Sequence, residues 1–224
     1  MSVVNSLAVT LDAINEAFFY NRAPSKAQAS EAVAWILSRQ VTAGRYAGSF
    51  VPTDYDYGDG GALFTGEKLQ TRLATRNILT AEAARALALC DGSPAEIQVA
   101  LARTNQWLLG QCFSRSCTVG ECAHSTVGLM RYLAVARLDD AERRLAAHVA
   151  VLSEHRDGKG RWVRFPFYYT LLALTEIALP SATDELQYAV PACQHVLERP
   201  STDTPFFQRR RDIVGRAIAK CQLL

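Results

Sequence analysis

A repeat is the feature that most constrains how this chain can fold. Three similar helix-like segments start at residues 106, 150 and 194, so they lie 44 residues apart. The segments that follow them, around Gly128, Leu172 and Gly215, are separated by 44 and then 43 residues. A period in the low forties is typical of helix pairs, which cannot bury their apolar faces alone and therefore stack on their neighbours. The alternative is an irregular helical bundle in which the spacing arises by chance.

Apolar residues recur at intervals of three and four along nearly the whole chain, as they do at Leu7, Leu11, Ile14 and Phe18. This period is that of amphipathic helices, and no segment shows the alternation of a half-buried strand. We therefore predict an all-α fold with a single domain over residues 1–224. A first helix is expected at residues 5–20, and four helical hairpins at about residues 28–90, 97–137, 141–179 and 185–222. Within the first hairpin, Thr80 followed by Glu82 is typical of a helix N-terminus.

The composition narrows the class of protein. Hydrophobic residues make up 49% of the 224 residues and charged residues 21%, which excludes a wholly disordered chain. The 24 Lys and Arg residues nearly balance the 22 Asp and Glu residues, which argues against a nucleic-acid surface. No stretch approaches the roughly 20 apolar residues of a membrane span, and the first residues do not have the pattern of a secretory signal. We expect a cytoplasmic protein whose six cysteines are mostly reduced.

The hairpins share one scheme, in which a helix ends near an aromatic residue and a glutamine, and a polar loop leads to a second apolar helix. Examples are Trp35 with Gln40, Trp107 with Gln111, and residues 157–162 before the apolar segment 165–174. This scheme resembles the repeats of the α/α-toroid superfamily, which includes squalene–hopene cyclases and protein prenyltransferases. The resemblance implies hairpins around a central cavity that binds an apolar or isoprenoid-like small molecule, in a cyclase- or transferase-like protein.

Two departures limit what the resemblance implies. Toroids of this superfamily usually contain more than four hairpins, so this chain would form a partial or minimal ring. The acidic motif of the class II cyclases, Asp-x-Asp-Asp, is only approximated by Asp54, Asp56 and Asp59, so no catalytic acid is carried over. An open α-solenoid of the HEAT type has the same period and is the alternative fold. The alternative function is a non-catalytic module that binds a protein or peptide on its concave face.

One cluster of cysteine and histidine has the spacing Cys-x4-Cys-x4-Cys-x-His, with the residues Cys112, Cys117, Cys122 and His124. Thiolate and imidazole are the ligands that zinc prefers. We predict that Cys117, Cys122 and His124 bind a zinc ion. The toroid resemblance is consistent with this prediction, because protein prenyltransferases and lanthipeptide cyclases bind zinc through Cys and His. The next loop, at residues 155–157, offers a further ligand. The alternatives are buried thiols beside a capping histidine, or a disulfide.

The same cluster and an aromatic segment supply candidate catalytic groups. Cys122 and His124 are a candidate nucleophile and general base, because a helix N-terminus lowers the pKa of a thiol. In a ring of hairpins the starts of the inner helices converge on one end of the central cavity. His124, Tyr168 and Tyr169 would meet there and polarise a bound molecule. The alternative for the aromatic segment is a plain seam of the core.

Two charged segments complete the candidates. Arg209 and Arg210, at the start of the last helix, suit a phosphate or diphosphate group of a cofactor or substrate, although such a run is also common on a solvated helix face. The three aspartates of the loop at residues 51–61 suit a hard cation. As the long insertion in the repeat scheme, this loop is alternatively a lid, a partner contact or a solvated connection. The sequence names no reaction.

Overall fold

The computed structural model describes residues 6–22, 24–58, 61–91, 93–200 and 205–222. Over this part of the chain the regular secondary structure is helical, and β pairing is confined to isolated bridges. The all-α prediction is therefore confirmed. The α-helices are α1 (Leu7–Phe19), α2 (Lys26–Ser38), α3 (Arg72–Asp91), α4 (Ala95–Leu109), α5 (Cys122–Leu133), α6 (Ala141–Glu154), α7 (Phe167–Glu176), α8 (Pro180–Glu198) and α9 (Pro205–Gln222). Two short 3-10 helices are η1 (Tyr55–Tyr57) and η2 (Cys112–Arg115).

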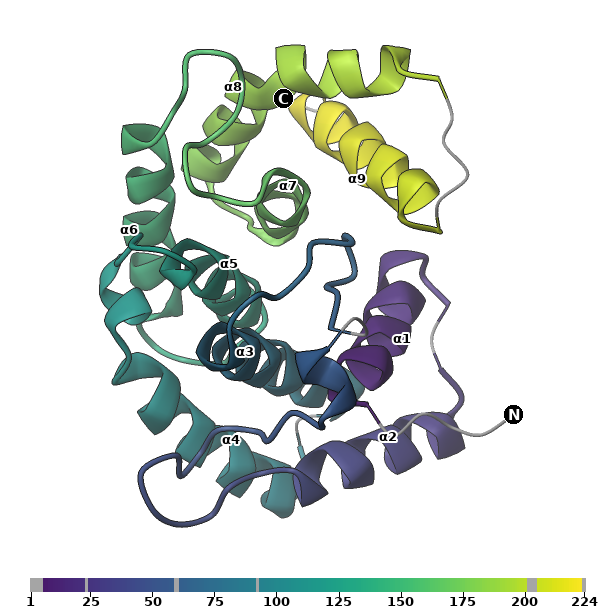
Figure 1. Cartoon of the computed structure of the whole chain (residues 1–224), viewed down its shortest axis with the longest axis vertical. Coiled ribbons are helices and arrows are strands. Elements are labelled where there is room, and N and C mark those ends of the chain that lie inside the picture. The colour runs from purple at the N-terminus through teal and green to yellow at the C-terminus, as the bar shows by residue number, and fades with distance from the viewer. Residues whose placement is uncertain (1–5, 23, 59–60, 92, 201–204, 223–224) are drawn as a thin grey trace.

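The helices form an outer and an inner layer that alternate along the chain (Figure 1). Helices α2, α4, α6 and α8 lie at the periphery, and α3, α5 and α7 lie inside them. The inner helices contact one another in the order α1, α3, α5, α7 and α9. Helices α2 and α8 contact the inner helices that follow them, α3 and α9, whereas α4 and α6 contact the inner helices that precede them, α3 and α5. The helices alternate along the chain in the order that the four expected hairpins require, but α4 and α6 pack more on the inner helix before them than on the one after.

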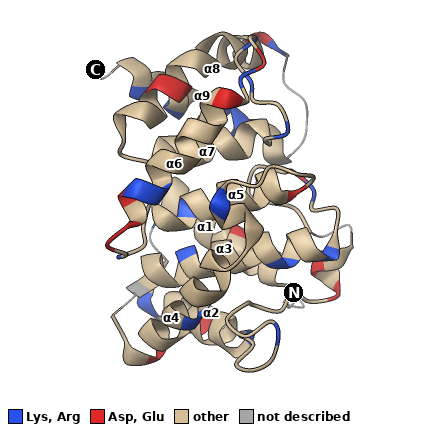
Figure 2. Ribbon diagram, turned by 90° about the vertical axis from the view of Figure 1, so that its left-hand side faces the viewer, with Lys and Arg blue, Asp and Glu red and all other residues tan. Residues whose placement is uncertain are grey.

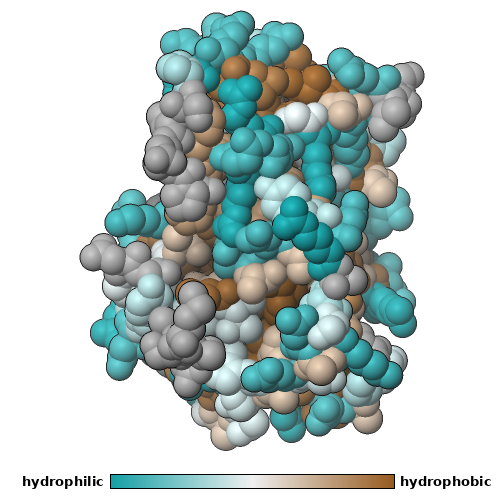
Figure 3. Space-filling model, turned by 90° about the vertical axis from the view of Figure 1, so that its right-hand side faces the viewer, coloured by the Kyte–Doolittle hydropathy of each residue, from teal (hydrophilic) through white to brown (hydrophobic). Residues whose placement is uncertain are grey.

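Side chains of α1 and α9 close the inner helices into a ring. The Arg209 guanidinium in α9 pairs with Asp12 in α1 at 2.8 Å and also with Glu16. The Tyr20 hydroxyl, at the end of α1, donates to Asp212 at 2.6 Å. Figure 3 shows this side of the molecule, which is largely hydrophilic with smaller apolar patches. An open solenoid has no seam between its first and last helices, so the described residues form a ring instead.

Local sequence signals account for several helix starts. Ser6 caps α1, because its hydroxyl accepts a hydrogen bond from the Val9 N–H at 3.1 Å. Ser25 and Gln28 form a capping box at the start of α2. Pro180 begins α8, at a position where the N–H that proline lacks would have no helical partner.

The predicted helix start at Thr80 is wrong. Thr80 lies inside α3 and is fully buried. Its hydroxyl accepts a hydrogen bond from the Phe50 N–H at 3.0 Å, so it holds the connection that precedes α3. A residue with the chemistry of a cap can satisfy a distant backbone group instead, and the sequence does not distinguish the two uses.

Apolar side chains from the inner helices and from the inward faces of the outer helices form one continuous core, which includes Ile36, Leu87, Leu129, Leu174 and Val214. On the face shown in Figure 2, basic and acidic residues are interspersed, as the near balance of charges leads one to expect. Among the described helices, none combines the length and the hydropathy that a membrane crossing requires.

Candidate functional site

The loop before α5 folds back on itself and brings three cysteines together. Cys112 starts η2, Cys117 lies in the turn that follows, and Cys122 is the first residue of α5. Ser116 and Gly120 adopt positive φ angles of 65° and 56°, which lets the chain reverse within a short loop. As a result, the three Sγ atoms lie within 4.8 Å of one another.

The spacing of the sulfur atoms fits a shared metal ion. The Sγ atoms of Cys112 and Cys122 are 3.6 Å apart. Two thiolates that each bind one tetrahedral zinc ion at about 2.3 Å lie roughly 3.8 Å from each other. Cys112 is exposed, and Cys117 and Cys122 are half-buried, so an ion can reach the sulfurs from solvent. The loop therefore presents a three-sulfur ligand set, defined here as the cysteine cluster.

The thiols of the cysteine cluster differ in how readily they lose a proton. The Val119 backbone N–H lowers the pKa of Cys117. Burial, together with the neighbouring thiols, raises the pKa of Cys122 to about 12. The expectation that the helix start lowers the pKa of Cys122 is therefore wrong, because burial and the adjacent sulfurs outweigh the helix dipole. A cation bound between the sulfurs would favour all three thiolates, so metal binding here is coupled to proton release.

His124 is not part of the cysteine cluster. It follows Cys122 by two positions on α5, and successive helical residues turn by about 100°, so the two side chains diverge. His124 Nδ1 is buried without a hydrogen-bond partner, and burial lowers the pKa of the ring. Where we predicted Cys117, Cys122 and His124 together, the described residues bring Cys112 to Cys117 and Cys122 instead. The Cys122 thiol likewise contacts Cys112 rather than a histidine base.

Two histidines, His148 in α6 and His155 at its C-terminal end, contact the loop that carries the cysteines. His155 Nε2 lies 3.3 Å from the Thr118 hydroxyl, and His155 Nδ1 lies 2.8 Å from the Val151 carbonyl oxygen. Both ring nitrogens of His155 therefore have partners, and it positions the loop rather than extending the ligand set. His148 Nδ1 lies 3.5 Å from the Ser116 hydroxyl, and burial lowers the pKa of His148 to about 4.

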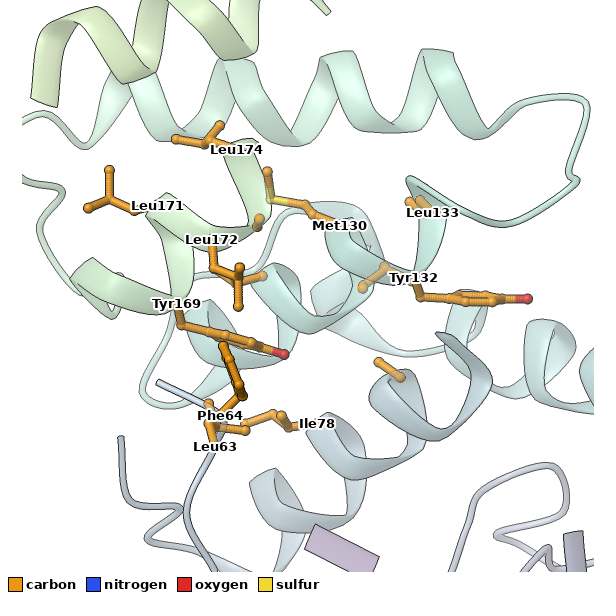
Figure 4. Packing of buried hydrophobic residues seen from close by; sticks show 14 of the residues in the cluster. Leu63, Phe64, Ile78, Met130, Tyr132, Leu133, Tyr169, Leu171, Leu172 and Leu174 are labelled. Atoms are coloured by element: carbon orange, nitrogen blue, oxygen red, sulfur yellow. The ribbon is translucent and has the colours of Figure 1, made fainter. Parts of the chain in front are cut away.

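Tyr168 and Tyr169 occupy different environments although they are neighbours in α7. Tyr169 is fully buried, and its hydroxyl donates to Glu82 at 2.5 Å. Figure 4 shows the Tyr169 ring packed among core residues, next to Phe64. Tyr168 is half-buried, with the Arg210 guanidinium 4.7 Å from its ring centroid. The two tyrosines therefore do not face one cavity, and Tyr169 belongs to the core.

The long connection between α2 and α3 covers the end of the ring where the inner helices begin, and it runs through the centre of Figure 1. Its Glu67 carboxylate accepts a hydrogen bond from the Tyr169 N–H at the start of α7, at 3.2 Å. The Arg210 Nε of α9 donates to the Thr65 carbonyl at 2.8 Å. Glu121, just before α5, accepts from the two N–H groups that precede α3. The connection thus fills the place where a ligand at the mouth of the ring was expected.

The predicted phosphate-binding arginines are held by protein groups. Arg209 pairs with Asp12 and Glu16, and although burial opposes it, these carboxylates raise the pKa of Arg209 further. Arg210 is held by the Thr65 carbonyl and the ring of Tyr168. Both side chains act in closing the ring and fixing the connection over its mouth.

Asp56, in the acidic loop, is fully buried and caps the first helix. Its carboxylate accepts hydrogen bonds from the N–H groups of Leu7 at 3.1 Å, Ala8 at 3.0 Å and Thr53 at 2.6 Å. A carboxylate at a helix N-terminus complements the positive end of the helix dipole. This arrangement satisfies Asp56 without a cation. Asp54 is exposed, and Asp59 lies outside the described residues.

A buried charge network, which sequence reasoning missed, fills the axis of the ring. Arg131 on α5 is 2% exposed and donates to Glu82 at 2.5 Å and to Glu176 at 2.9 Å. Arg85 donates to Asn15 and to Glu176, both at 2.7 Å. Helices α1, α3, α5 and α7 each contribute to these five residues, defined here as the axial network. In the sequence, the signal for this network was the presence of charged residues among apolar neighbours in the segments that form the inner helices.

The axial network is balanced, with two guanidinium groups facing two carboxylates. Burial alone would raise the pKa of Glu82, but Arg131 and Arg85 outweigh burial and lower it. Removing one partner of such a buried ion pair destabilises the fold, because the other charge is left uncompensated. The network therefore holds the inner helices together.

Comparisons with known proteins give no relative for this chain. No family model matches the sequence, and no match is found among curated proteins or among solved structures. The function is therefore argued from the geometry of the site.

Proposed function

We propose that the protein binds a thiophilic metal ion, zinc in the first instance, through Cys112, Cys117 and Cys122. The observation that carries the proposal is the approach of three Sγ atoms to within 4.8 Å of one another. Three neighbouring thiolates repel one another, whereas a divalent cation turns the same arrangement into favourable coordination.

The number of protein ligands supports a metal ion that keeps one coordination position for an exchangeable ligand. Structural zinc sites almost always have four protein ligands, whereas catalytic sites have three and keep the fourth position for water or substrate. Within the described part of the chain the cysteine cluster has three members, and Cys112 lies exposed. We therefore assign the fourth position to water or to an external ligand.

The relationship to α/α toroids stays a proposal, supported by the alternation of outer and inner helices and by the α1–α9 seam. The binding of an apolar or isoprenoid-like molecule has less support at the mouth of the ring, which is filled by Thr65, Glu67 and their neighbours. A peptide bound on a concave face has less support from a closed ring than from an open arc.

Metal analysis and a cobalt titration test the proposal. Cobalt(II) serves as a spectroscopic substitute for zinc, because thiolate ligands give it a sulfur-to-metal charge-transfer absorption. The expected result is one metal ion per chain, with this absorption present in wild type and lost in Cys117→Ser and Cys122→Ser. Cys221→Ser is the matched control, because Cys221 is a free, half-buried thiol on α9 outside the cluster.

Two outcomes would overturn the proposal. One is an equal metal content in wild type and in the Cys122→Ser variant. The other is a cobalt spectrum without the thiolate absorption in a correctly folded wild-type protein. The open coordination position has its own readout, since azide added to the cobalt protein should shift the spectrum if it displaces a bound water.

A further inference from the structure

A pocket of about 310 Å³ lies at the end of the ring opposite the covered mouth. It is lined by residues from the C-terminal halves of four inner helices: Phe18 from α1, Arg85 from α3, Leu172 and Glu176 from α7, and Arg216 and Lys220 from α9. Its volume lies at the lower limit of the range of small-molecule pockets, roughly 300 to 1,000 Å³. This pocket is separate from the cysteine cluster, and no step of the metal proposal uses it.

The charges around the pocket are unequal, because three cations face one carboxylate. Lys220 is already satisfied, since its ammonium donates to the carbonyls of Leu174, Thr175 and Ile177 at the end of α7. An ammonium has three N–H donors, so these bonds use all of them. The cations with unused donors are therefore Arg85 and Arg216.

Arg85 is 6% exposed, and its guanidinium is only partly hydrogen-bonded. Its Nη1 and Nη2 atoms donate to Asn15 and Glu176, whereas Nε is buried without a partner. A buried N–H without an acceptor is destabilising. Arg85 thus forms a cationic wall of the pocket whose hydrogen bonding the protein itself does not complete.

Arg216 is the exposed cation of the pocket, and contacts with Phe19 hold its side chain in place. Its guanidinium lies over the Phe19 ring, with 3.7 Å between the guanidinium carbon and the ring centroid, and Nη2 donates to the Phe19 carbonyl. A guanidinium has five N–H donors in a planar fork, so the remaining edge suits a carboxylate.

We propose that this pocket binds a small amphipathic anion, a carboxylate with about eight carbons in all, seven of them in its apolar chain. The carboxylate pairs with Arg216, and the chain lies against Phe18, Leu89 and Leu172. At about 30 Å³ per water-sized group, 310 Å³ corresponds to roughly ten non-hydrogen atoms, which is the size of octanoate.

Calorimetric titration of the full chain with octanoate, butanoate and inorganic phosphate tests the proposal. We expect octanoate to bind with a Kd of about 1 mM or below, and butanoate to bind at least about tenfold more weakly, because it buries fewer methylene groups. We expect phosphate to bind more weakly than octanoate, since it has no apolar part. Tighter binding of phosphate than of octanoate, or no saturation by octanoate at about 10 mM, would overturn the proposal.

Two variants separate the contributions of charge and apolar contact. Arg216→Gln should weaken octanoate binding by about tenfold. Arg143→Gln, an exposed arginine on α6, is the matched control and should leave the Kd unchanged. Phe18→Ala should weaken octanoate more than butanoate, because Phe18 contacts the chain rather than the carboxylate. Circular dichroism confirms that each variant is folded, and equal octanoate affinity in wild type and Arg216→Gln would contradict the assignment.

Discussion

The axial network and the cysteine cluster differ in how far the fold already satisfies their polar groups. In the axial network, Arg131 is bonded to Asn15, Glu82 and Glu176, and it is almost inaccessible to solvent. In the cysteine cluster, the sulfurs approach one another and remain within reach of solvent. The difference teaches that the buried charges at the centre of the ring stabilise the fold, whereas the groups suited to a metal ion lie in a loop at its rim.

The largest expected effect comes from breaking the axial network. Arg131→Met leaves Glu82 and Glu176 without their central cation, and removing one partner of a buried ion pair costs about 3–5 kcal/mol. Urea unfolding followed by circular dichroism measures this loss in the free energy of unfolding. Glu142→Gln, at an exposed position of α6, is the control and should change stability by less than about 0.5 kcal/mol.

The double variant Glu82→Gln/Arg131→Met sharpens this result. Removing one carboxylate together with the arginine leaves less uncompensated charge, so part of the lost stability should return. If Arg131→Met unfolds at nearly the same urea concentration as wild type, the axial network does not stabilise the ring.

Acidification is expected to weaken the support of the cysteine loop. Burial lowers the pKa of His148 from 6.5 to about 4, so the folded protein keeps this ring neutral where the unfolded chain binds a proton. The contribution of His148 to the free energy of unfolding should therefore fall by about 3 kcal/mol as the pH is lowered from 6.5 to 4, and this contribution then levels off. Urea unfolding at several pH values measures this slope. His148→Gln should flatten it, whereas the exposed His195→Gln should leave it unchanged.

Zinc should stabilise the protein through the cysteine cluster alone. An ion that binds only the folded state, at a free concentration about 100 times its Kd, raises the free energy of unfolding by about 2.7 kcal/mol. Thermal unfolding with and without zinc should show this gain in wild type and in Arg143→Gln. A gain of the same size in Cys117→Ser would place the ion elsewhere.

The smallest effect is expected for Cys112→Ser without metal. Cys112 is exposed, so replacing its sulfur by oxygen should change stability by less than about 0.5 kcal/mol. Cys193→Ser is the contrasting variant, because Cys193 is buried in the core and a hydroxyl there lacks the apolar fit of a thiol. A large loss for Cys112→Ser in metal-free protein would show that the cluster stabilises the fold by itself.

The helical architecture could be predicted because helix periodicity and a fixed repeat are properties of neighbouring residues. The spacing of Cys112, Cys117 and Cys122 also indicated a ligand set. His124 was assigned to that set although it follows Cys122 by two positions on a helix, and the angle between such side chains argues against shared coordination. Helix geometry alone was enough to favour Cys112 over His124.

The axial network and the covered mouth could not be read from the sequence. Glu82, Arg85 and Glu176 look like ordinary surface charges until their helices are placed side by side, because their partners are 45 to 91 positions away. The connection after α2 likewise has a composition typical of a solvated loop. Its role depends on Glu67 meeting the start of α7, which only the closed ring brings near.

The seam between α1 and α9 has a consequence for how the protein is made. Its contacts join residues more than 190 positions apart, among them Tyr20 with Asp212 and Asp12 with Arg209. During synthesis from the N-terminus, α1 leaves the ribosome long before the helix that secures it. The hairpins between them can stack in order of synthesis, but the first helix acquires its final neighbour last, so ring closure is expected to be the concluding step of folding.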